Sequence, residues 1–147
     1  MDLLTSRFGA VQFDASEVIV VDNGLDGYSA ARQWLLLADG AHAELYWLQS
    51  ISMSEVAIPV ISPWAVDSDY KLRIDSTISH RLRLQADSET PLILVRIDEA
   101  SGGLMIRMDI PIAINVQTQR GGQIYLDGIQ PLQWETSDQS ETLKQSA

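Results

Sequence analysis

Two short apolar runs, separated by only a few residues, constrain the fold of this chain most strongly. The first, Tyr46–Ser50, alternates aromatic and aliphatic side chains, and the second, Val56–Ile61, is rich in β-branched residues. Runs of this length and composition predict strands, and Ser52–Glu55 between them is too short for a helix. Pro59 cannot donate a hydrogen bond to a neighbouring strand, so we expect it at a sheet edge or a bulge.

Gln49 places a polar amide inside the first of these runs. If the side chain is buried, the amide must find hydrogen-bond partners, because an unpaired buried amide costs about 1–3 kcal/mol. A satisfied polar group at the centre of an apolar sheet favours one packing geometry over the alternatives.

The rest of the chain repeats the pattern of short apolar segments separated by turn residues. Tyr70–Ile74 alternates apolar and charged residues, and Pro91–Ile97 and Leu104–Ile110 flank the turn residues Gly102-Gly103 as in a hairpin. The remaining expected strands are Val11–Phe13, Glu17–Val21, Trp34–Leu37, Ile112–Val116 and Gln123–Leu126. About nine or ten short strands with regular turn signals predict an all-β, mainly antiparallel fold, either a β-barrel or a sandwich, and we favour a small barrel-like domain.

Helix is expected in at most one or two short pieces. Ser29–Arg32 is long enough for one helical turn capped by Ser29, and Ser76–Ser88 fits a short helix, a strand at Leu82–Leu84, or both. We expect one domain over residues 1–133. From Trp134 the composition shifts to acidic and small polar residues, which predicts a disordered acidic tail over residues 134–147.

Composition excludes several classes of function. The formal net charge of the chain is −10, and its ten Lys and Arg residues are scattered, whereas phosphate binding requires clustered cations. An acidic surface repels nucleic acid and attracts basic proteins, although acidity also serves solubility alone. With no apolar run long enough to span a bilayer, no basic leader and no cysteine, we expect a soluble cytoplasmic protein that binds neither membrane nor nucleic acid.

No pattern of residues predicts catalysis or metal binding. The two histidines, His42 and His80, lie in unrelated segments, and no serine carries a nucleophile motif. Asp22–Gly27 matches a calcium loop at only three positions and is better explained as a turn. We therefore expect no enzyme, no metal site and no cofactor, and we interpret Trp34 and Trp47 as core residues, with Trp64 at a strand end left between core and surface.

Five motifs, taken in order, give the chain a resemblance to a known family. They are Thr5–Gly9 (TSRFG), Gly24–Tyr28 (GLDGY), Tyr46–Ser50 (YWLQS), Ile110–Asn115 (IPIAIN) and Gly121–Leu126 (GGQIYL). Their order and spacing, over roughly Thr5 to Asp127, resemble the FliW family of flagellar assembly factors. The chain departs from the family pattern at Asp26, where proline is usual, at Tyr28, where phenylalanine is usual, and at Asp109, where lysine is usual.

The resemblance implies a non-enzymatic, barrel-like protein with two protein partners. The first implied partner is CsrA, a dimeric RNA-binding translational repressor, and the second is flagellin. Binding of CsrA would relieve the repression of flagellin translation, and competition by flagellin would couple translation to filament assembly. The alternatives that remain from the residues alone are a barrel that binds a small ligand through Trp47 or Trp64, and an enzyme built around His42 or His80.

The predicted site follows from charge and from turn placement. Five acidic loop residues are expected to attract the basic partner: Asp67, Asp69, Asp98, Glu99 and Asp109. Ten residues of the family motifs are interpreted as the scaffold that supports the interface: Phe8, Gly9, Gly24, Gly27, Tyr46, Trp47, Gln49, Pro111, Asn115 and Gln123.

Overall fold

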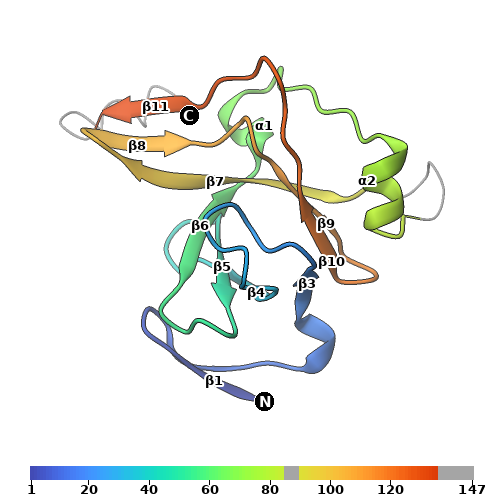
Figure 1. Ribbon diagram of the computed structural model, residues 1–147. Helices are drawn as coiled ribbons and strands as arrows, with labels where there is room; N and C mark the ends of the chain where they lie inside the picture. The colour runs from blue at the N-terminus through green and yellow to red at the C-terminus, as the bar shows by residue number, and fades with distance from the viewer. Residues whose placement is uncertain (85–89, 136–147) are drawn as a thin grey trace.

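The computed structural model describes residues 1–84 and 90–135 of the chain. Strands predominate in this part of the chain, with two short α-helices and one 3₁₀ turn (Figure 1). The elements are β1 (Asp2–Thr5), β2 (Gly9–Gln12), the 3₁₀ turn η1 (Ala15–Glu17), β3 (Ile19–Val21), β4 (Gln33–Ala38), β5 (Leu45–Ser50), β6 (Ala57–Ile61), α1 (Pro63–Val66), α2 (Ser76–Arg81), β7 (Leu92–Ala100), β8 (Gly103–Ile106), β9 (Ile112–Asn115), β10 (Arg120–Gln123) and β11 (Leu132–Glu135). No helix in this part of the chain is long and apolar enough to cross a membrane.

Seven strands close into a barrel. Their order around the wall is β7, β6, β5, β4, β3, β10 and β9, and β9 pairs back onto β7. The pairing of β3 with β10 is parallel and every other pairing in the wall is antiparallel. The structure therefore confirms the expected all-β, mainly antiparallel barrel with at most two short helices.

The interior of the barrel is filled by side chains from all around the wall. Trp34 is completely buried at its centre, with its indole Nε1 donating to the carbonyl of Ala31 at 2.8 Å. The residues packed with it are Ile19, Val21, Leu25, Ala31, Leu48, Val56, Ile58, Val60, Leu94, Ile112 and Ile114. Because burial of apolar surface is the main stabilising contribution to a domain of this size, this cluster fixes the barrel.

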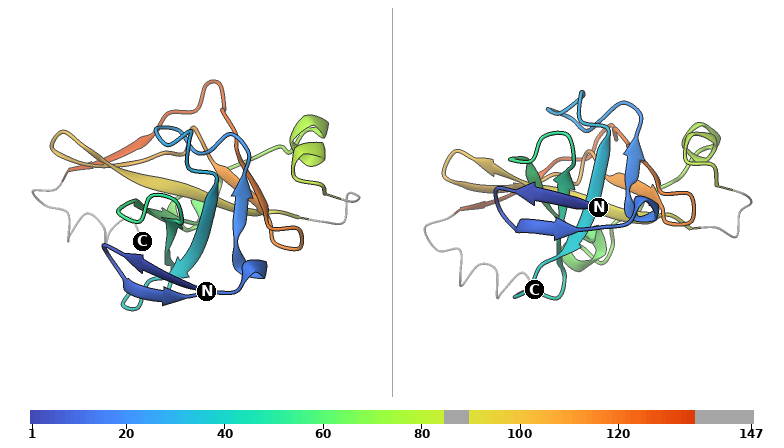
Figure 2. Two further views of the ribbon diagram at one scale, coloured as in Figure 1. Left: turned by 60° about the horizontal axis from the view of Figure 1, so that its bottom comes forward. Right: turned by 90° about the horizontal axis from the view of Figure 1, so that it is seen from below.

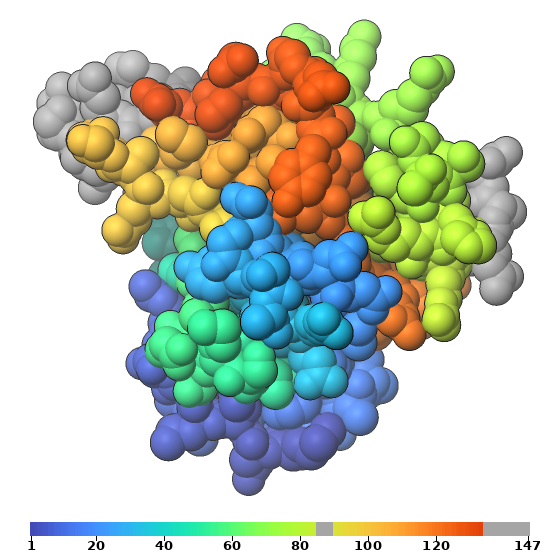
Figure 3. Space-filling view, in the orientation of Figure 1, coloured from blue at the N-terminus to red at the C-terminus, as the bar shows by residue number. Residues whose placement is uncertain are grey.

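The long strand β7 belongs to the barrel at one end and to an extension at the other. Residues 92–94 pair with β9, residues 95 and 96 pair with β6, and residues 97–100 pair with β8. β11 then adds to the outer edge of β8. The β7–β8–β11 extension projects from one side of the barrel, and α2 lies on the opposite side (Figure 3).

A separate hairpin of β1 and β2 packs against the outside of the barrel near β5 and β6 (Figure 2). The amide of Ser6 donates to the carbonyl of Ser54 at 3.2 Å. The Phe8 ring meets Trp47 edge-on, with 5.8 Å between the ring centroids, and the Arg7 guanidinium lies 4.1 Å from the centroid of a Trp47 ring. Trp47 thus belongs to a second, outer layer and not to the barrel interior.

Both helices begin at residues suited to that position. Pro63 occupies the first helical position of α1, where its missing N–H has no partner to lose. Asp75 caps α2 by accepting a hydrogen bond from the Ile78 amide at 2.9 Å. Of the possibilities for Ser76–Ser88, the helix is present through Arg81, whereas Leu82–Leu84 is no strand and residues 85–88 lie outside the described part of the chain.

Three expected elements differ in the structure. Tyr70–Ile74 forms no strand, although Tyr70 is buried and Leu72 and Ile74 pack into the core, because the segment crosses the molecule between α1 and α2 and has no strand partner in the described chain. Ser29–Arg32 is a turn without helix. In place of the strand expected at Gln123–Leu126, β10 covers Arg120–Gln123, because these residues pair with β9 and, at Arg120 and Gly121, with β3. Gly121 fits closely there, since a Cβ would lie 3.2 Å from a Val21 methyl group.

The ends of two further segments also differ from expectation. β8 stops at Ile106, four residues before the predicted end at Ile110, because the chain turns at Met108, whose amide donates to the Ile106 carbonyl at 2.9 Å. β11 continues through Glu135, past the expected boundary of the domain at residue 133. The remainder of the predicted tail, residues 136–147, lies outside the described chain.

Candidate protein-binding surface

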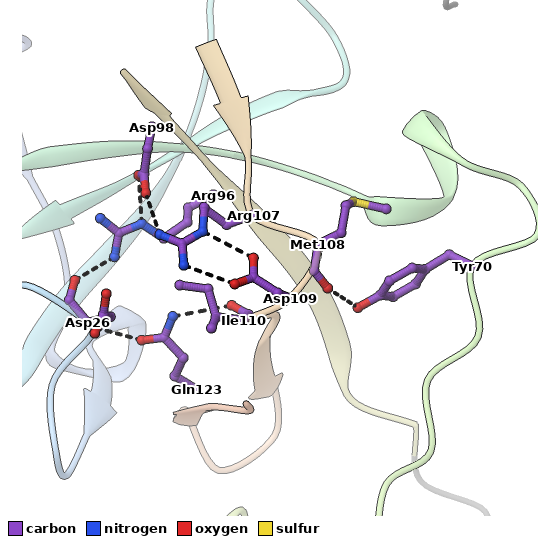
Figure 4. A network of polar contacts seen from close by, with 9 residues as sticks. All are labelled: Asp26, Tyr70, Arg96, Asp98, Arg107, Met108, Asp109, Ile110 and Gln123. Carbon is purple, nitrogen blue, oxygen red and sulfur yellow. Dashed lines mark hydrogen bonds and ion pairs between the residues drawn. The ribbon is translucent and has the colours of Figure 1, made fainter. Parts of the chain in front are cut away.

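An arginine–carboxylate network ties the extension to the barrel (Figure 4). Arg96 on β7 donates through Nε to Asp98 at 2.8 Å. Arg107, in the connection from β8 to β9, reaches Asp98 at 3.3 Å and holds both carboxylate oxygens of Asp109 at 3.0 and 3.1 Å. This two-pronged contact is the strongest geometry available to an arginine–carboxylate pair.

The network continues into the loop between β3 and β4. Arg96 donates through an Nη to the Asp26 carbonyl at 2.6 Å, and the Asp26 amide donates to Gln123 at 2.6 Å. Gln123 in turn donates to the Ile110 carbonyl at 3.2 Å. The main chain of Asp26, rather than its carboxylate, makes these contacts, and the bond to Gln123 requires an amide hydrogen that a proline would lack.

The charges in this network shift one another's protonation equilibria. Hydrogen bonds from Arg107 lower the pKa of the Asp109 carboxyl below its usual value, and the same hydrogen bonds raise the pKa of Arg107. Burial raises the pKa of the Tyr70 hydroxyl, which donates to the Met108 carbonyl at 2.9 Å. Asp98 and Asp109 each lie against an arginine, so their charges are balanced within the molecule.

The five acidic residues predicted as a site thus fall into two groups. Asp98 and Asp109 face arginines and contribute little uncompensated charge. Asp67, Asp69 and Glu99 are exposed, and none of them forms an ion pair with another described residue. Asp67 ends α1 and accepts a hydrogen bond from the backbone amide of Asp69 at 3.0 Å, and both residues line one groove.

An apolar strip adjoins Asp67 and Asp69. Trp64 on α1 is 43% exposed, stacks edge-on against Tyr70 with 5.8 Å between ring centroids, and donates to the Tyr70 carbonyl at 2.8 Å. Ile129 and Leu132, 38% and 41% exposed, line a groove of about 290 Å³ together with Asp67, Asp69, Tyr70, Lys71, Met108 and Gln130. Trp64 does not line this groove itself but adjoins it through its ring contact with Tyr70. We call Trp64, Ile129, Leu132 and the two aspartates of the groove the Trp64 strip. Exposed apolar side chains bordered by charge are typical of protein-binding surfaces.

The residues interpreted as scaffold hold local structure at several places. Asn115 is buried and donates to the carbonyls of Leu82 and Arg83 at 2.9 and 3.3 Å, which fixes the end of α2 on the barrel. Gln49 is fully buried and donates to the carbonyls of Ser50 and Ser54 at 2.9 and 3.1 Å, while its Oε1 has no partner in the described chain.

The other motif residues serve turns and contacts. Gly24 has φ +66° and lies so close to Ser29 that a Cβ would come within 2.7 Å of its backbone, so no other residue fits. Gly9 and Gly27 also have positive φ, Phe8 contacts Trp47, Pro111 is buried, and Tyr46 is 36% exposed. Trp47 donates to the Asp39 carboxylate at 3.0 Å.

Sequence reasoning missed the arginines of the network. Arg96 and Arg107 each precede an aspartate by two residues, in the triplets Arg96-Ile97-Asp98 and Arg107-Met108-Asp109. Side chains two apart on a strand point to the same face, so this spacing was an available signal for the pair on β7. Arg107 and Asp109 lie beyond the end of β8 at Ile106, where the strand rule does not apply. The pairing of Asp98 with Arg107, by contrast, depends on the fold and carries no local signal.

The alternatives based on ligands and catalysis find little support in this geometry. The barrel interior is filled, and the groove that Trp47 lines lies outside it. Asp22–Gly27 is a turn closed by the Gly24 amide on the Val21 carbonyl, and within residues 1–84 and 90–135 no group of three or more potential metal ligands is gathered. His42 contacts Asp39 at 3.0 Å and His80 lies on α2, so the described histidines do not converge.

Comparison with known proteins identifies the family. The family model described as FliW protein matches residues 2–137. The chain belongs to the FliW family. A protein of Magnetococcus marinus named flagellar assembly factor FliW is 30% identical over 135 residues, covering 90% of this chain and 83% of the relative. A protein of the same name from Caldanaerobacter subterraneus is 30% identical over 129 residues, covering 86% of each.

The fold of this FliW protein is also found in a solved structure. The crystal structure of the flagellar assembly factor FliW superposes with a TM-score of 0.80, covering 90% of this chain and 94% of that chain, at 19% sequence identity. At this level of identity the likeness concerns the fold. The family assignment therefore depends on the sequence matches, and the shared barrel agrees with them.

Proposed function

We infer that this FliW protein is a flagellar assembly factor that acts by binding two proteins, CsrA and flagellin. Binding of CsrA relieves the repression of flagellin translation, and binding of flagellin couples translation to filament assembly. The support for this function is membership of a family whose relatives carry the name flagellar assembly factor, together with an exposed surface suited to protein binding.

The Trp64 strip is the observation that carries the proposal. An RNA-binding protein presents basic side chains, and Asp67 and Asp69 are exposed acidic residues that form no ion pair with an arginine or lysine of the described chain. Apolar contacts at Trp64 and Leu132 supply affinity, and the flanking charges speed encounter and orient the partner. Glu99 adds a further uncompensated charge on the extension, whereas Asp98 and Asp109 act through their structural ion pairs.

The charge contribution is tested by titrating CsrA into the protein and measuring the binding constant by calorimetry. The double variant Asp67→Asn/Asp69→Asn should weaken binding by roughly fivefold, because exposed ion pairs contribute about 0.2–1 kcal/mol each. The matched control, Asp2→Asn/Glu55→Gln, changes the net charge equally at two exposed residues outside the strip and should bind nearly as the parent does. Affinity of the parent should fall as salt rises.

The apolar contribution is tested at Trp64. Trp64→Ala should weaken CsrA binding by roughly thirtyfold, since truncating a central interface tryptophan costs about 2 kcal/mol or more. Tyr125→Ala, which removes an aromatic ring that is 67% exposed outside the strip, is the control. Titration of flagellin with the same variants decides whether the second partner uses the strip. Failure of the parent protein to bind either CsrA or flagellin would contradict the proposed function.

A further inference from the structure

The ladder between β6 and β7 stops after two residue pairs, Val60 with Arg96 and Ile61 with Val95. The direction of each backbone group follows from neighbouring hydrogen bonds. The Val56 carbonyl accepts from Ser50 on β5, and in an antiparallel strand the direction alternates, so the backbone groups of Ala57 and Pro59 are directed toward β7.

The same reasoning applies to β7. The Arg96 carbonyl accepts from the Arg107 amide on the side of β8 and β9, so Ile97 and Glu99 direct their backbone groups toward β6. Continuing the register places Pro59 opposite Ile97 and Ala57 opposite Glu99. Proline has no N–H, so the carbonyl of Ile97 receives no hydrogen bond from it, and the ladder ends at this point.

Beyond Pro59 the two strands enclose a groove of about 560 Å³. β6 meets β7 only at its C-terminal end, and the strands diverge below that point (Figure 1). The wall includes Ala57, Ile58 and Pro59 from β6 and Ile97, Asp98 and Glu99 from β7. We call this gap the β6–β7 slot. Among the described residues, no strand pairs with either edge along the slot, which is the arrangement that an added strand completes.

The side chains around the slot define its chemistry. Leu45, Trp47 and Leu104 complete an apolar lining. The Arg96 and Asp98 side chains neutralise each other at 2.8 Å, which leaves two charges to be matched by an occupant. Arg7 stacks on Trp47, which is the cross-strand neighbour of Pro59, and Glu99 lies opposite Ala57 in the continued register. The positive and the negative charge therefore lie at different register positions of β6.

We propose that the β6–β7 slot binds an extended segment of a partner protein by strand addition. The segment lies along the edge of β7, donates main-chain hydrogen bonds to the Ile97 and Glu99 carbonyls, and carries apolar side chains at alternate positions. A basic residue of the segment pairs with Glu99. The slot is separate from the Trp64 strip, so its occupation adds a binding activity beyond docking at that strip.

A peptide strand fits the slot better than a small ligand or a second copy does. The groups that no described strand pairs are main-chain groups spaced along two strands. Another main chain in extended form, with a rise of about 3.3 Å per residue, matches that spacing. The groove is bounded by the β1–β2 hairpin through Arg7, so a single strand enters it more readily than a folded sheet edge does.

The proposal is tested with a synthetic probe, the acetylated and amidated peptide Val-Thr-Val-Lys-Val-Thr-Val. Its addition to the full-length ¹⁵N-labelled protein should shift the amide signals of Ala57, Ile97 and Glu99 and slow their hydrogen exchange. The same peptide N-methylated throughout keeps its side chains but lacks main-chain donors, and it should not bind. Absence of these shifts at millimolar peptide, or equal binding of the N-methylated peptide, would overturn the proposal.

Closing the slot supplies an independent test. Pro59→Val restores the missing donor opposite Ile97, so the ladder should lengthen, Tm should rise, and the affinity for the probe should fall by about tenfold or more. Pro131→Val, which replaces a proline outside the slot, should leave the affinity unchanged. Undiminished probe binding by a stably folded Pro59→Val variant would exclude the slot as the binding site.

Charge exchange tests the assigned chemistry. The Glu99→Lys variant should bind the lysine probe about fivefold less tightly than the parent does, and it should prefer the probe in which glutamate replaces lysine. Asp2→Asn changes an exposed acid outside the slot and should retain the preference of the parent. If Glu99→Lys leaves the preference between the two probes unchanged, Glu99 does not face the occupant and the proposed register is wrong.

Discussion

The two halves of β7 are held in different ways. Residues 92–94 lie in the barrel wall and pair with β9, and Ile93 and Leu94 are buried in the apolar core. Residues 97–100 have β8 on one edge and the β6–β7 slot on the other, and this half is fastened by ion pairs from Arg96 and Arg107. The first half of β7 is thus closed by burial and backbone pairing, whereas the second half keeps one edge accessible. We call residues 92–94 the closed half and residues 97–100 the open half.

This difference suggests how a small barrel acquires a binding surface without losing its core. Apolar packing supplies most of the stability, and it is complete in the closed half. Partly exposed ion pairs contribute little to stability but impose geometry, because Arg107 must meet Asp98 and Asp109 together. The open half can therefore keep unpaired strand edges at a fixed position while the closed half maintains the fold.

The largest effect is expected from damage to the closed half. Ile114 on β9 is 1% exposed and faces the barrel core beside β7. Ile114→Ala should lower the free energy of unfolding by about 3 kcal/mol, because a buried cavity replaces the lost methyl groups. Urea denaturation measures the change, and Ile97→Ala in the open half, where the side chain is only partly buried, should cost clearly less. Equal costs would contradict the distinction between the halves.

The second effect concerns the buried amide that attaches α2 to the closed half. Asn115→Ala removes the donor to the Arg83 carbonyl and leaves the Leu82 carbonyl with only the longer bond from Thr118, so it should cost about 2 kcal/mol in unfolding free energy. Thr118→Val is the matched comparison, because the Thr118 hydroxyl donates to the same Leu82 carbonyl at 3.3 Å but is exposed. Thr118→Val should lower the free energy of unfolding by only about a few tenths of a kcal/mol. A similar loss in both variants would show that the burial of the donor does not decide the effect.

The elements that sequence patterns predicted well are those whose evidence is local. The alternation in Tyr46–Ser50 predicted β5, and the glycine pair Gly102-Gly103 predicted the β7–β8 hairpin, whose turn lies one residue earlier, at Ser101-Gly102. The closure of β9 onto β7 and the parallel contact of β3 with β10 join residues far apart in sequence, and no local pattern encodes them. The barrel was therefore predictable as a class, while the shared role of β7 was not.

Tyr70–Ile74 shows why alternation alone misleads. The segment alternates buried and exposed side chains as a strand does, yet it forms no ladder in the described chain. Alternation reports that one side of an extended segment faces the core, and it carries no information on whether a neighbouring strand is present.

The candidate site shows the same limit. Choosing acidic residues by turn placement found Asp67 and Asp69, which are exposed, but also Asp98 and Asp109, whose charges are matched by arginines. Charge counts along a sequence do not show which charges the fold pairs. The Arg-x-Asp spacing offered a partial signal, because it predicts pairs within one strand.

A third, smaller effect is expected from the open half. Arg107→Met removes the two-pronged contact with Asp109 and the contact with Asp98, and it should cost about 1–2 kcal/mol in low salt. The control is Arg120→Met, because Arg120 forms a single 3.2 Å contact with the exposed Asp22 and should cost less than about 1 kcal/mol. Denaturation curves at increasing salt concentration should show a smaller difference in unfolding free energy between the two variants. An Arg107→Met variant as stable as the control would contradict the role of Arg107 in holding the open half.

The smallest effect is expected from acid titration of Asp39 and Asp109, which hold the β4–β5 connection and the open half respectively. Hydrogen bonds from Trp47 and His42 lower the pKa of Asp39 to about 2, and those from Arg107 lower the pKa of Asp109. A carboxyl whose pKa is depressed in the folded state contributes stability above its unfolded pKa of about 3.9 and loses it as the pH falls through the folded value. Unfolding free energies measured from pH 5 to pH 2 should therefore decline less steeply in Asp39→Asn and in Asp109→Asn than in the parent. Asp109 belongs to the network of the open half, so only Asp109→Asn should also alter the hydrogen exchange of the Glu99 amide. If Asp39→Asn changed that exchange equally, the slot would not depend on the arginine–carboxylate network.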